Sequence, residues 1–236
     1  MRTAAAALVS VCALAVGPAF AGGWTELGDA GNSLASAQLI PANVPTTSLN
    51  SIGGTLSDQL DVDLYMIHIS DPASFSATTV GGNLMDTQLF LFALNGTAIY
   101  TNNDDLAYSA DASSFPLSTL PVGHNLGPIT AGYYLLGISL SGNDPVNANN
   151  ELLFANGLPT DVRGPAGNQS PATLSGFTGL TSYDENGAYA ITLTGADMTA
   201  PIPEPATNAL MLAGLGLCGL AASRKGRRAA ATEVAA

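Results

Sequence analysis

Residues 88–101 read QLFLFALNGTAIYT and carry the clearest hairpin pattern in the chain. Two apolar runs, Gln88–Leu94 and Thr97–Thr101, flank the dipeptide Asn95-Gly96. Aromatic and β-branched runs joined by Asn-Gly are the strongest short-range signal for a β-hairpin, and Asn-Gly suits a type I′ turn. The stretch therefore predicts two antiparallel strands.

The sequence on either side of this hairpin predicts further short strands. They are Asn50–Leu56, Asp61–Ile69, Phe75–Val80, Tyr133–Leu140 and Ala188–Thr194. In DVDLYMIHI (61–69) both faces are apolar after Asp63, which is typical of a strand inside a sandwich. No convincing amphipathic helix exceeds about two turns. The sequence thus predicts an all-β fold, an antiparallel β-sandwich or jelly roll over residues 22–198.

One long segment of this domain does not read as strand. Residues 142–172 are rich in Asn, Gly and Pro. We expect a surface excursion that is too polar to contribute to a core.

The charge of the domain is strongly one-sided. Between Gly22 and Ala200 the only basic residue is Arg163, against sixteen Asp and Glu residues. This balance repels phosphate backbones, excludes nucleic acid as a partner and attracts cations. The two cysteines, Cys12 and Cys218, lie in the terminal apolar runs, so the domain has no disulfide and no thiolate site.

The N-terminus has the order of parts of a secretory signal peptide. Arg2 precedes the apolar run Ala4–Val16, and Ala19-Phe20-Ala21 is a small-x-small cleavage site. The sequence predicts a signal peptide over residues 1–21, the Sec translocon and signal peptidase as partners, and a mature chain that begins at Gly22.

The C-terminus has three consecutive parts. A Pro-rich linker (199–205) contains Pro203-Glu204-Pro205, and residues 206–222 carry no charge. As a transmembrane helix this run is about 26 Å long, enough for a thin bilayer. The tail, residues 223–236, holds four basic residues that stay cytoplasmic beside such a span: Arg224, Lys225, Arg227 and Arg228. With Arg2 setting the same orientation at the other end, the acidic middle is exported.

This tripartite pattern resembles the PEP-CTERM sorting signal of exported proteins in Gram-negative bacteria, typically those that make exopolysaccharide. The resemblance implies that an exosortase, a membrane-embedded cysteine transpeptidase-like enzyme, reads Pro203, Glu204 and Pro205. Two prolines hold that site extended and unable to pair in a sheet, which suits a protease-like groove. The alternative is a plain C-terminal membrane anchor with a Pro-rich stem.

A second resemblance covers about residues 51–140. The order GTLSDQLDVDLYMIHI, DTQLFLFALNGTAIYTNNDD and ITAGYYLLGISL is similar to the bacterial pre-peptidase C-terminal-like β-sandwich. Modules of that family accompany secreted enzymes and surface proteins and are not themselves catalytic, so the resemblance implies a non-catalytic domain.

The residues for nucleophilic catalysis are sparse. The only histidines are His68, on a predicted strand, and His124, in a predicted loop. There is no H-E-x-x-H, no lysine in the domain and no phosphate loop. We therefore predict that the protein is not an enzyme, with a secreted hydrolase of unrecognised site as an alternative.

Two acidic segments are candidates for binding calcium, which takes six to eight oxygen ligands. Asp61 and Asp63 start one strand, and Asn103, Asp104 and Asp105 follow another. If the segments meet, a site forms; otherwise these residues cap turns. No other cofactor is predicted. A calcium-dependent carbohydrate-binding module is thus a further alternative, with aromatic platforms from Trp24, Tyr100, Tyr108 or Tyr183.

Together these patterns predict an exported, non-catalytic β-sandwich protein. It would pass through an intermediate anchored in the inner membrane and then reach the cell surface or an extracellular matrix. Association with exopolysaccharide or biofilm is the expected setting, with extracellular polysaccharide as a candidate partner.

Overall fold

The part of the chain that the structure describes is built from strands, as the alternation of its residues predicts. The computed structural model describes residues 22–41, 48–82, 85–107, 116–167, 173–179 and 185–198, and every regular element there is a strand. None of the described segments forms a helix able to cross a membrane. The predicted signal peptide, sorting motif, apolar helix and basic tail lie outside these residues.

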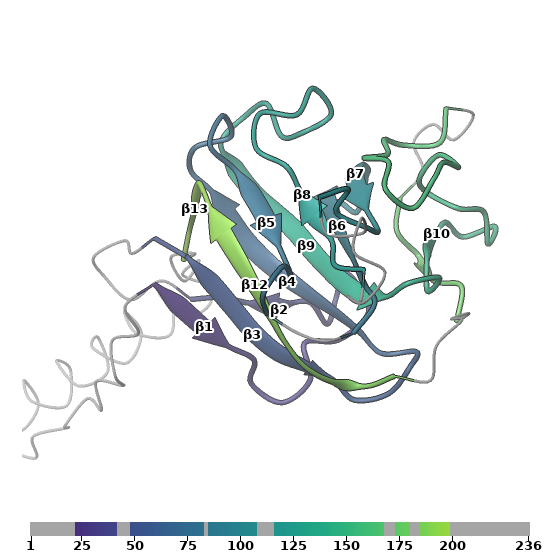
Figure 1. Ribbon diagram of the computed structural model, residues 1–236, viewed down its shortest axis with the longest axis horizontal. Coiled ribbons are helices and arrows are strands. Elements are labelled where there is room, and N and C mark those ends of the chain that lie inside the picture. Colours follow the sequence, from purple (N-terminus) through teal and green to yellow (C-terminus); the bar gives the residue numbers. More distant parts are fainter. Residues whose placement is uncertain are drawn as a thin grey trace, which may run out of the picture. The chain divides into compact units, whose positions relative to one another are not determined.

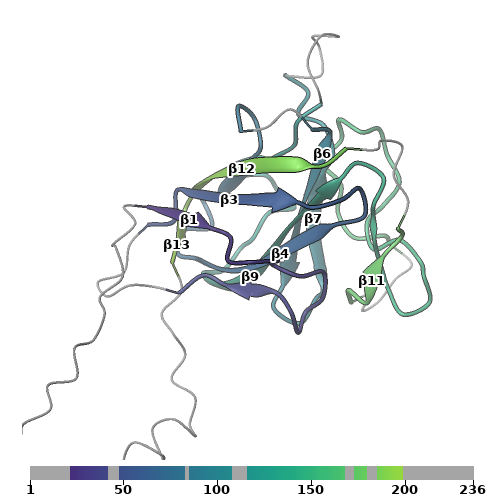
Figure 2. The ribbon, with the colours of Figure 1, turned by 90° about the horizontal axis from the view of Figure 1, so that it is seen from below.

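Two sheets face each other, as Figures 1 and 2 show. The first has the order β1 (Gly23–Thr25), β3 (Ser51–Leu56), β12 (Gly187–Thr194), β5 (Ser76–Thr78) and β8 (Thr119–Leu120). The second has the order β13 (Ala196–Asp197), β4 (Val62–Ile69), β9 (Gly132–Leu140), β6 (Thr87–Ala93) and β7 (Ala98–Asn102), and β2 (Gln38–Leu39) also pairs with β4. A small pair consists of β10 (Pro145–Val146) and β11 (Gly176–Phe177).

The expectation of purely antiparallel sheets is wrong at two places. β1 runs parallel to β3, and β2 runs parallel to β4. Both parallel strands come from the N-terminal segment, which adds a short strand to each sheet. The short β1 and β2 were not predicted, because runs of two or three residues carry too little pattern to be recognised.

The predicted hairpin exists as β6 and β7, but its turn differs from the expectation. Type I′ requires positive φ at both central residues, whereas Gly96 has φ of 84° and Asn95 has a negative φ. The Gly96 amide donates to the Ala93 carbonyl over 2.8 Å, and the Ala93 amide donates to the Thr97 carbonyl over 2.8 Å. The connection is therefore a type I turn followed by a left-handed glycine, which forms a G1 bulge.

The main core fills the space between the two sheets. It takes Ile52 and Ile191 from the first sheet, and Tyr65, Ile67 and Ile138 from the second. All five side chains are fully buried. The chain passes from one sheet to the other at Gly195, between β12 and β13, where φ is 66° and a Cβ would lie 2.5 Å from the Asp71 carbonyl oxygen. Only glycine fits this crossing.

A second core covers the outer face of the six-stranded sheet, and it corrects our view of residues 142–172. Leu153 and Phe154 of this excursion are buried against Phe90, Phe92 and Leu64. The excursion lies at one end of the sandwich (Figure 1). Within its described residues, turns occur at 148–149 and 159–160, while a few apolar side chains anchor the segment. It is therefore not a purely polar surface loop, which explains why β4 and β6 are apolar on both faces.

Candidate functional site

The structure separates the two halves of the predicted calcium site. Asp63 pairs in register with Ile138, which pairs with Leu89, which pairs with Asn102. Three strand spacings, roughly 14 Å, therefore lie between the backbone at Asp63 and the strand that leads into Asn103. Asp61 and Asp63 do not meet the segment 103–105.

Two of the five predicted ligands cap turns. The Asp61 carboxylate accepts hydrogen bonds from the amides of Ser57 (2.6 Å) and Val62 (2.8 Å). Asp105 accepts a hydrogen bond from the Ala107 amide over 2.8 Å. For these two residues the turn-cap interpretation is confirmed.

Asn103 and Asp104 lie near the single arginine of the domain. Asn103 is buried, and its Oδ1 has no hydrogen-bond partner. The Asp104 Oδ1 is also buried without a partner. Burial raises the pKa of Asp104, and the positive charge of Arg163 opposes that rise. Asp104 thus belongs to a charged region around Arg163.

Asp63 instead belongs to an acidic cluster that the sequence did not reveal. Ligand oxygens of Glu26, Asp29 and Asp63 lie within 4.8 Å of one another. Glu26 and Asp29 come from the segment between β1 and β2, and the parallel pairing of β2 with β4 brings that segment beside β4. The carbonyl of Gly31 in the same loop accepts a hydrogen bond from the Leu64 amide over 3.1 Å. No local motif signals this cluster, because Glu26 and Asp29 lie far from Asp63 in the sequence.

The side chain of Asp63 points into the core between the sheets and is fully buried. Its Oδ2 accepts a hydrogen bond of 2.5 Å from the Tyr189 hydroxyl, and that hydroxyl lies 2.5 Å from the Tyr65 hydroxyl. Its Oδ1 has no hydrogen-bond partner. Burial raises the pKa of Asp63 to about 8, and the charges of Glu26, Asp61 and Asp29 add to the rise, while the Tyr189 hydrogen bond opposes it.

Glu26 is held in place more rigidly than Asp29. Its Oε1 accepts from the Ala30 amide over 2.9 Å, and its Oε2 accepts from the Thr55 amide over 2.8 Å. Asp29 is exposed and accepts one bond, from the Gly31 amide over 3.1 Å. The cluster thus consists of one buried, one half-buried and one exposed carboxylate, and it can receive a proton or a divalent cation.

The two histidines pack against tyrosines. The His68 ring lies 5.1 Å from the Tyr133 ring, and the His124 ring is stacked 6.4 Å from the Tyr100 ring. His124 Nδ1 accepts a hydrogen bond from the Leu126 amide over 3.2 Å. Among the described residues, no hydrogen bond of either imidazole reaches a serine.

The predicted aromatic platforms do not form an exposed row in the described chain. Tyr100 is fully buried, and Trp24 is half-buried with its indole N–H donating to Gln38 over 3.0 Å. Tyr108 and Tyr183 lie outside the described residues. A different aromatic side chain, Phe154, lines a pocket together with Asp144 and Arg163. No pattern in the sequence predicted this pocket, because the excursion was expected to carry no core residue.

Comparison with known proteins identifies the C-terminal motif. The sequence profile described as the PEP-CTERM protein-sorting motif matches residues 201–228. No curated protein matches the chain. The resemblance of residues 51–140 to the pre-peptidase C-terminal-like module stays a prediction.

The fold and this match together define the class of protein: an all-β body in a chain that carries an exosortase-type sorting signal. Such a signal implies export, an exosortase partner and processing at a bacterial membrane. Pro203, Glu204, Pro205 and the basic residues from Arg224 to Arg228 all lie inside the matched range. Of the predicted signal-peptide site, Gly22 is described: its carbonyl accepts hydrogen bonds from the amides of Asn50 and Ser51. Ala19 and Ala21 lie outside the described residues.

Proposed function

We propose that this chain is a non-catalytic protein of the cell surface or extracellular matrix, delivered there by exosortase processing at Pro203-Glu204-Pro205. The observation that carries the proposal is the match of residues 201–228 to the sorting motif. The N-terminal signal-peptide pattern and the one-sided acidic charge of the middle support export. Exopolysaccharide or biofilm is the proposed setting of the mature protein.

The test is an intact-mass measurement of the protein recovered from the medium and from membranes of a host that contains an exosortase. The wild type should lose residues 1–21 and a C-terminal segment that includes Arg224–Arg228. The variant Glu204→Ala should accumulate in the membrane with its C-terminal tail uncut. The matched control Glu233→Ala lies beyond the motif and should be processed normally. Equal processing of all three chains would contradict the proposal.

The absence of catalysis is part of this proposal. Both histidines of the domain pack on tyrosines, which accounts for them as structural residues. If the protein is instead a secreted hydrolase, His68→Ala or His124→Ala should abolish a hydrolytic activity measured on the purified full chain. Retention of any such activity in both variants would exclude a histidine-dependent hydrolase.

A second candidate function, binding of a divalent cation such as Ca²⁺, is favoured by one specific observation. Asp63 is fully buried, and its Oδ1 faces no hydrogen-bond donor although two further carboxylates lie beside it. A cation ligated by Glu26, Asp29 and Asp63, with water completing the shell, would satisfy that oxygen. It would also offset the mutual repulsion of the three carboxylates.

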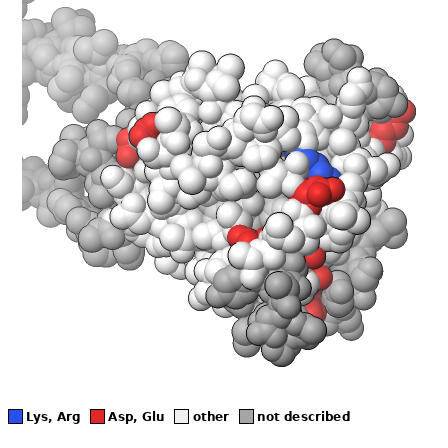
Figure 3. All heavy atoms as spheres, turned by 45° about the horizontal axis from the view of Figure 1, so that its top comes forward, with Lys and Arg blue, Asp and Glu red and all other residues white. Residues whose placement is uncertain are grey.

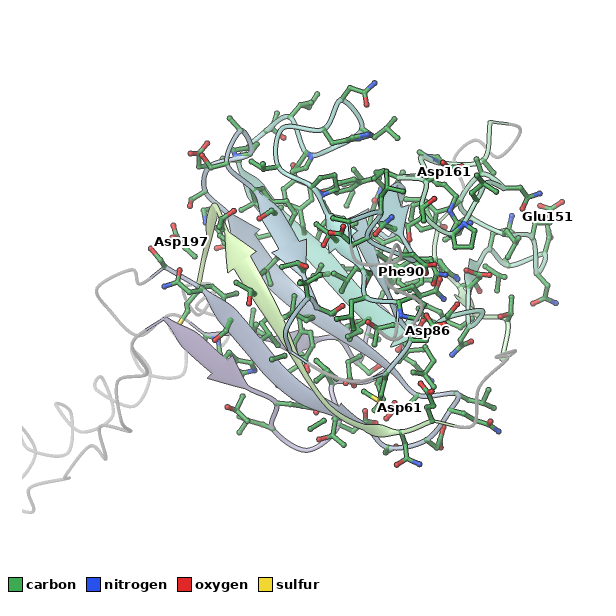
Figure 4. The ribbon with its side chains drawn as sticks, in the orientation of Figure 1. Asp61, Asp86, Phe90, Glu151, Asp161 and Asp197 are labelled. Carbon is green, nitrogen blue, oxygen red and sulfur yellow. The ribbon has the colours of Figure 1, made fainter. Side chains whose placement is uncertain are left out.

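Thermal unfolding of the full chain in detergent, with and without Ca²⁺ near pH 8, tests this second function. Binding to the folded state alone stabilises by about 2.7 kcal/mol at one hundred times the dissociation constant. Asp63→Asn should remove most of the shift, whereas Asp197→Asn, at the other end of the body (Figure 4), should keep it. An equal shift in both variants, or none in the wild type, would argue against a site at Asp63.

A further inference from the structure

A second polar site lies in the excursion, around the only basic side chain of the described chain. Arg163 is fixed through its backbone, because its amide and carbonyl exchange two hydrogen bonds of 2.9 Å with Thr101 of β7. Its side-chain stem packs over Gly157, where a Cβ would lie 3.1 Å from Arg163 Cδ. Its Nε is buried and has no hydrogen-bond partner. The guanidinium is therefore held in one place with donor capacity left over.

This guanidinium borders a pocket with a volume of about 60 Å³. The pocket is lined by Asp144, Pro145, Leu152, Phe154, Asn156 and Arg163. Three of these residues form an apolar wall, and the other three present a carboxylate, an amide and a guanidinium. A wall that is half apolar and half polar offers a small molecule both kinds of contact, packing and hydrogen bonds.

The fold holds the backbone of Asp144 and the ring of Phe154 in place. The Asp144 amide donates a hydrogen bond to Thr178 Oγ1 over 3.0 Å, and the Asp144 carbonyl accepts one from the Thr178 amide over 2.8 Å. Phe154 is buried against Phe90 and Phe92, with ring centroids 5.9 and 5.7 Å apart. The pocket is thus built on the rigid outer core of the six-stranded sheet, which favours binding without a large ordering cost.

The pocket carries side chains of both signs, so a ligand with a net charge meets repulsion from one of them whichever sign it has. Figure 3 shows basic atoms at one place on the displayed face, with acidic atoms directly beside them. Arg163 repels a cation, while Asp144, Asp104 and the acidic surroundings repel an anion. A neutral ligand rich in hydroxyl groups matches both sides, because a hydroxyl donates to a carboxylate and accepts from a guanidinium.

The size of the pocket fits one sugar ring. A water molecule needs roughly 10–15 Å³ of this kind of volume, so the pocket has room for a handful of waters. A pyranose ring displaces a similar number, and its C–H groups would pack on the apolar wall while its hydroxyls face the polar groups.

We propose that the pocket between Asp144, Phe154 and Arg163 binds a single neutral sugar residue of an extracellular polysaccharide. This inference rests on the proposed function only for the source of the sugar. The binding itself belongs to the all-β body and does not require processing at residues 203–205.

The test follows the guanidinium directly by NMR. The full chain is labelled with ¹⁵N-arginine in detergent, and the Nε–H signal of Arg163 is assigned by its loss in Arg163→Lys. The probes are the methyl glycosides of glucose, galactose, mannose and N-acetylglucosamine, titrated to tens of millimolar. At least one of them should move the Arg163 signal saturably. Glucuronate, as an anion, and glycine, as a zwitterion, should not.

The variant Asp144→Asn should weaken the binding of that glycoside roughly tenfold or more, because it removes a charged acceptor. Asp197→Asn makes the same chemical change far from the excursion and should leave the affinity unchanged. If Asp144→Asn fails to fold, as judged by thermal unfolding, the exposed Asn156→Ala replaces it and should weaken binding as well.

The proposal is overturned if none of the neutral glycosides gives a saturable shift. It is also overturned if glucuronate or glycine binds in their place, or if Asp144→Asn and Asn156→Ala both retain full affinity. Failure of C-terminal processing with intact sugar binding would overturn the proposed function alone, so the two results are separable.

Discussion

At the scale of single residues, the buried carboxyl group of Asp63 determines how stability depends on pH. Burial raises its pKa from 3.8 to about 8 in the folded state, so the folded protein holds a proton that the unfolded chain releases near pH 4. Stability from this group is therefore fully present below about pH 4 and is lost as the pH rises toward 8. In EDTA we expect the free energy of unfolding to fall by about 5 kcal/mol between pH 4 and pH 8.

The variant Asp63→Asn keeps the shape of the side chain and cannot ionise. Chemical unfolding in EDTA at pH 5 and pH 8 should therefore show a smaller loss of stability with pH in this variant than in the wild type. Asp197→Asn serves as the control and should follow the wild type. The same pH dependence in all three chains would show that Asp63 does not titrate as described.

Gly137 illustrates packing at the same scale. It lies in β9, where a Cβ would be 2.9 Å from Leu64 Cδ2 and 3.4 Å from Phe90 Cδ2. Gly137→Ala should destabilise the protein by about 1–3 kcal/mol, because the surrounding core is already full. Gly176→Ala, with nothing within 4 Å of the new methyl group, should change stability by less than about 0.5 kcal/mol. Denaturant unfolding of both variants checks this, and equal effects would contradict it.

At the scale of elements, the excursion is held on the six-stranded sheet by a few apolar side chains. Phe154 is buried beside Phe90 and Phe92, so Phe154→Ala should cost about 3–5 kcal/mol. It should also expose residues 142–167 to proteases, because the excursion loses its main anchor. Leu158→Ala, in the same segment but 66% exposed, should alter neither stability nor cleavage. Unchanged proteolysis of Phe154→Ala would show that other contacts hold the excursion.

At the scale of the whole molecule, the sixteen acidic side chains between Gly22 and Ala200 repel one another, and Arg163 is the only arginine or lysine in that range to offset them. Raising the salt concentration from about 0.01 M to 0.15 M shortens the Debye length from about 30 Å to 8 Å. The melting temperature of the exported protein should therefore rise with salt, and the rise should shrink at pH 4, where many carboxylates are neutral. A melting temperature independent of salt at pH 7 would contradict this expectation.

The sequence predicted one residue of the acidic cluster but not the partners of that residue. Asp63 was recognised as a candidate ligand, but its partners are Glu26 and Asp29 rather than Asn103, Asp104 and Asp105. The prediction depended on two sequence segments meeting, and β9 and β6 stand between them. Sequence spacing along one strand says nothing about which strands are neighbours in the sheet.

The sequence by itself determined the all-β character, the position of the β6–β7 hairpin and the C-terminal sorting motif. Each of these depends on residues that are close together in the chain: alternation within a strand, a Gly-containing turn, or a run of Pro-Glu-Pro, apolar and basic residues. Tertiary structure alone decided the parallel pairing of β1 with β3 and of β2 with β4, the acidic cluster at Asp63 and the pocket at Arg163. Those features join distant segments, and the burial of apolar side chains on both faces of one sheet selects which segments meet.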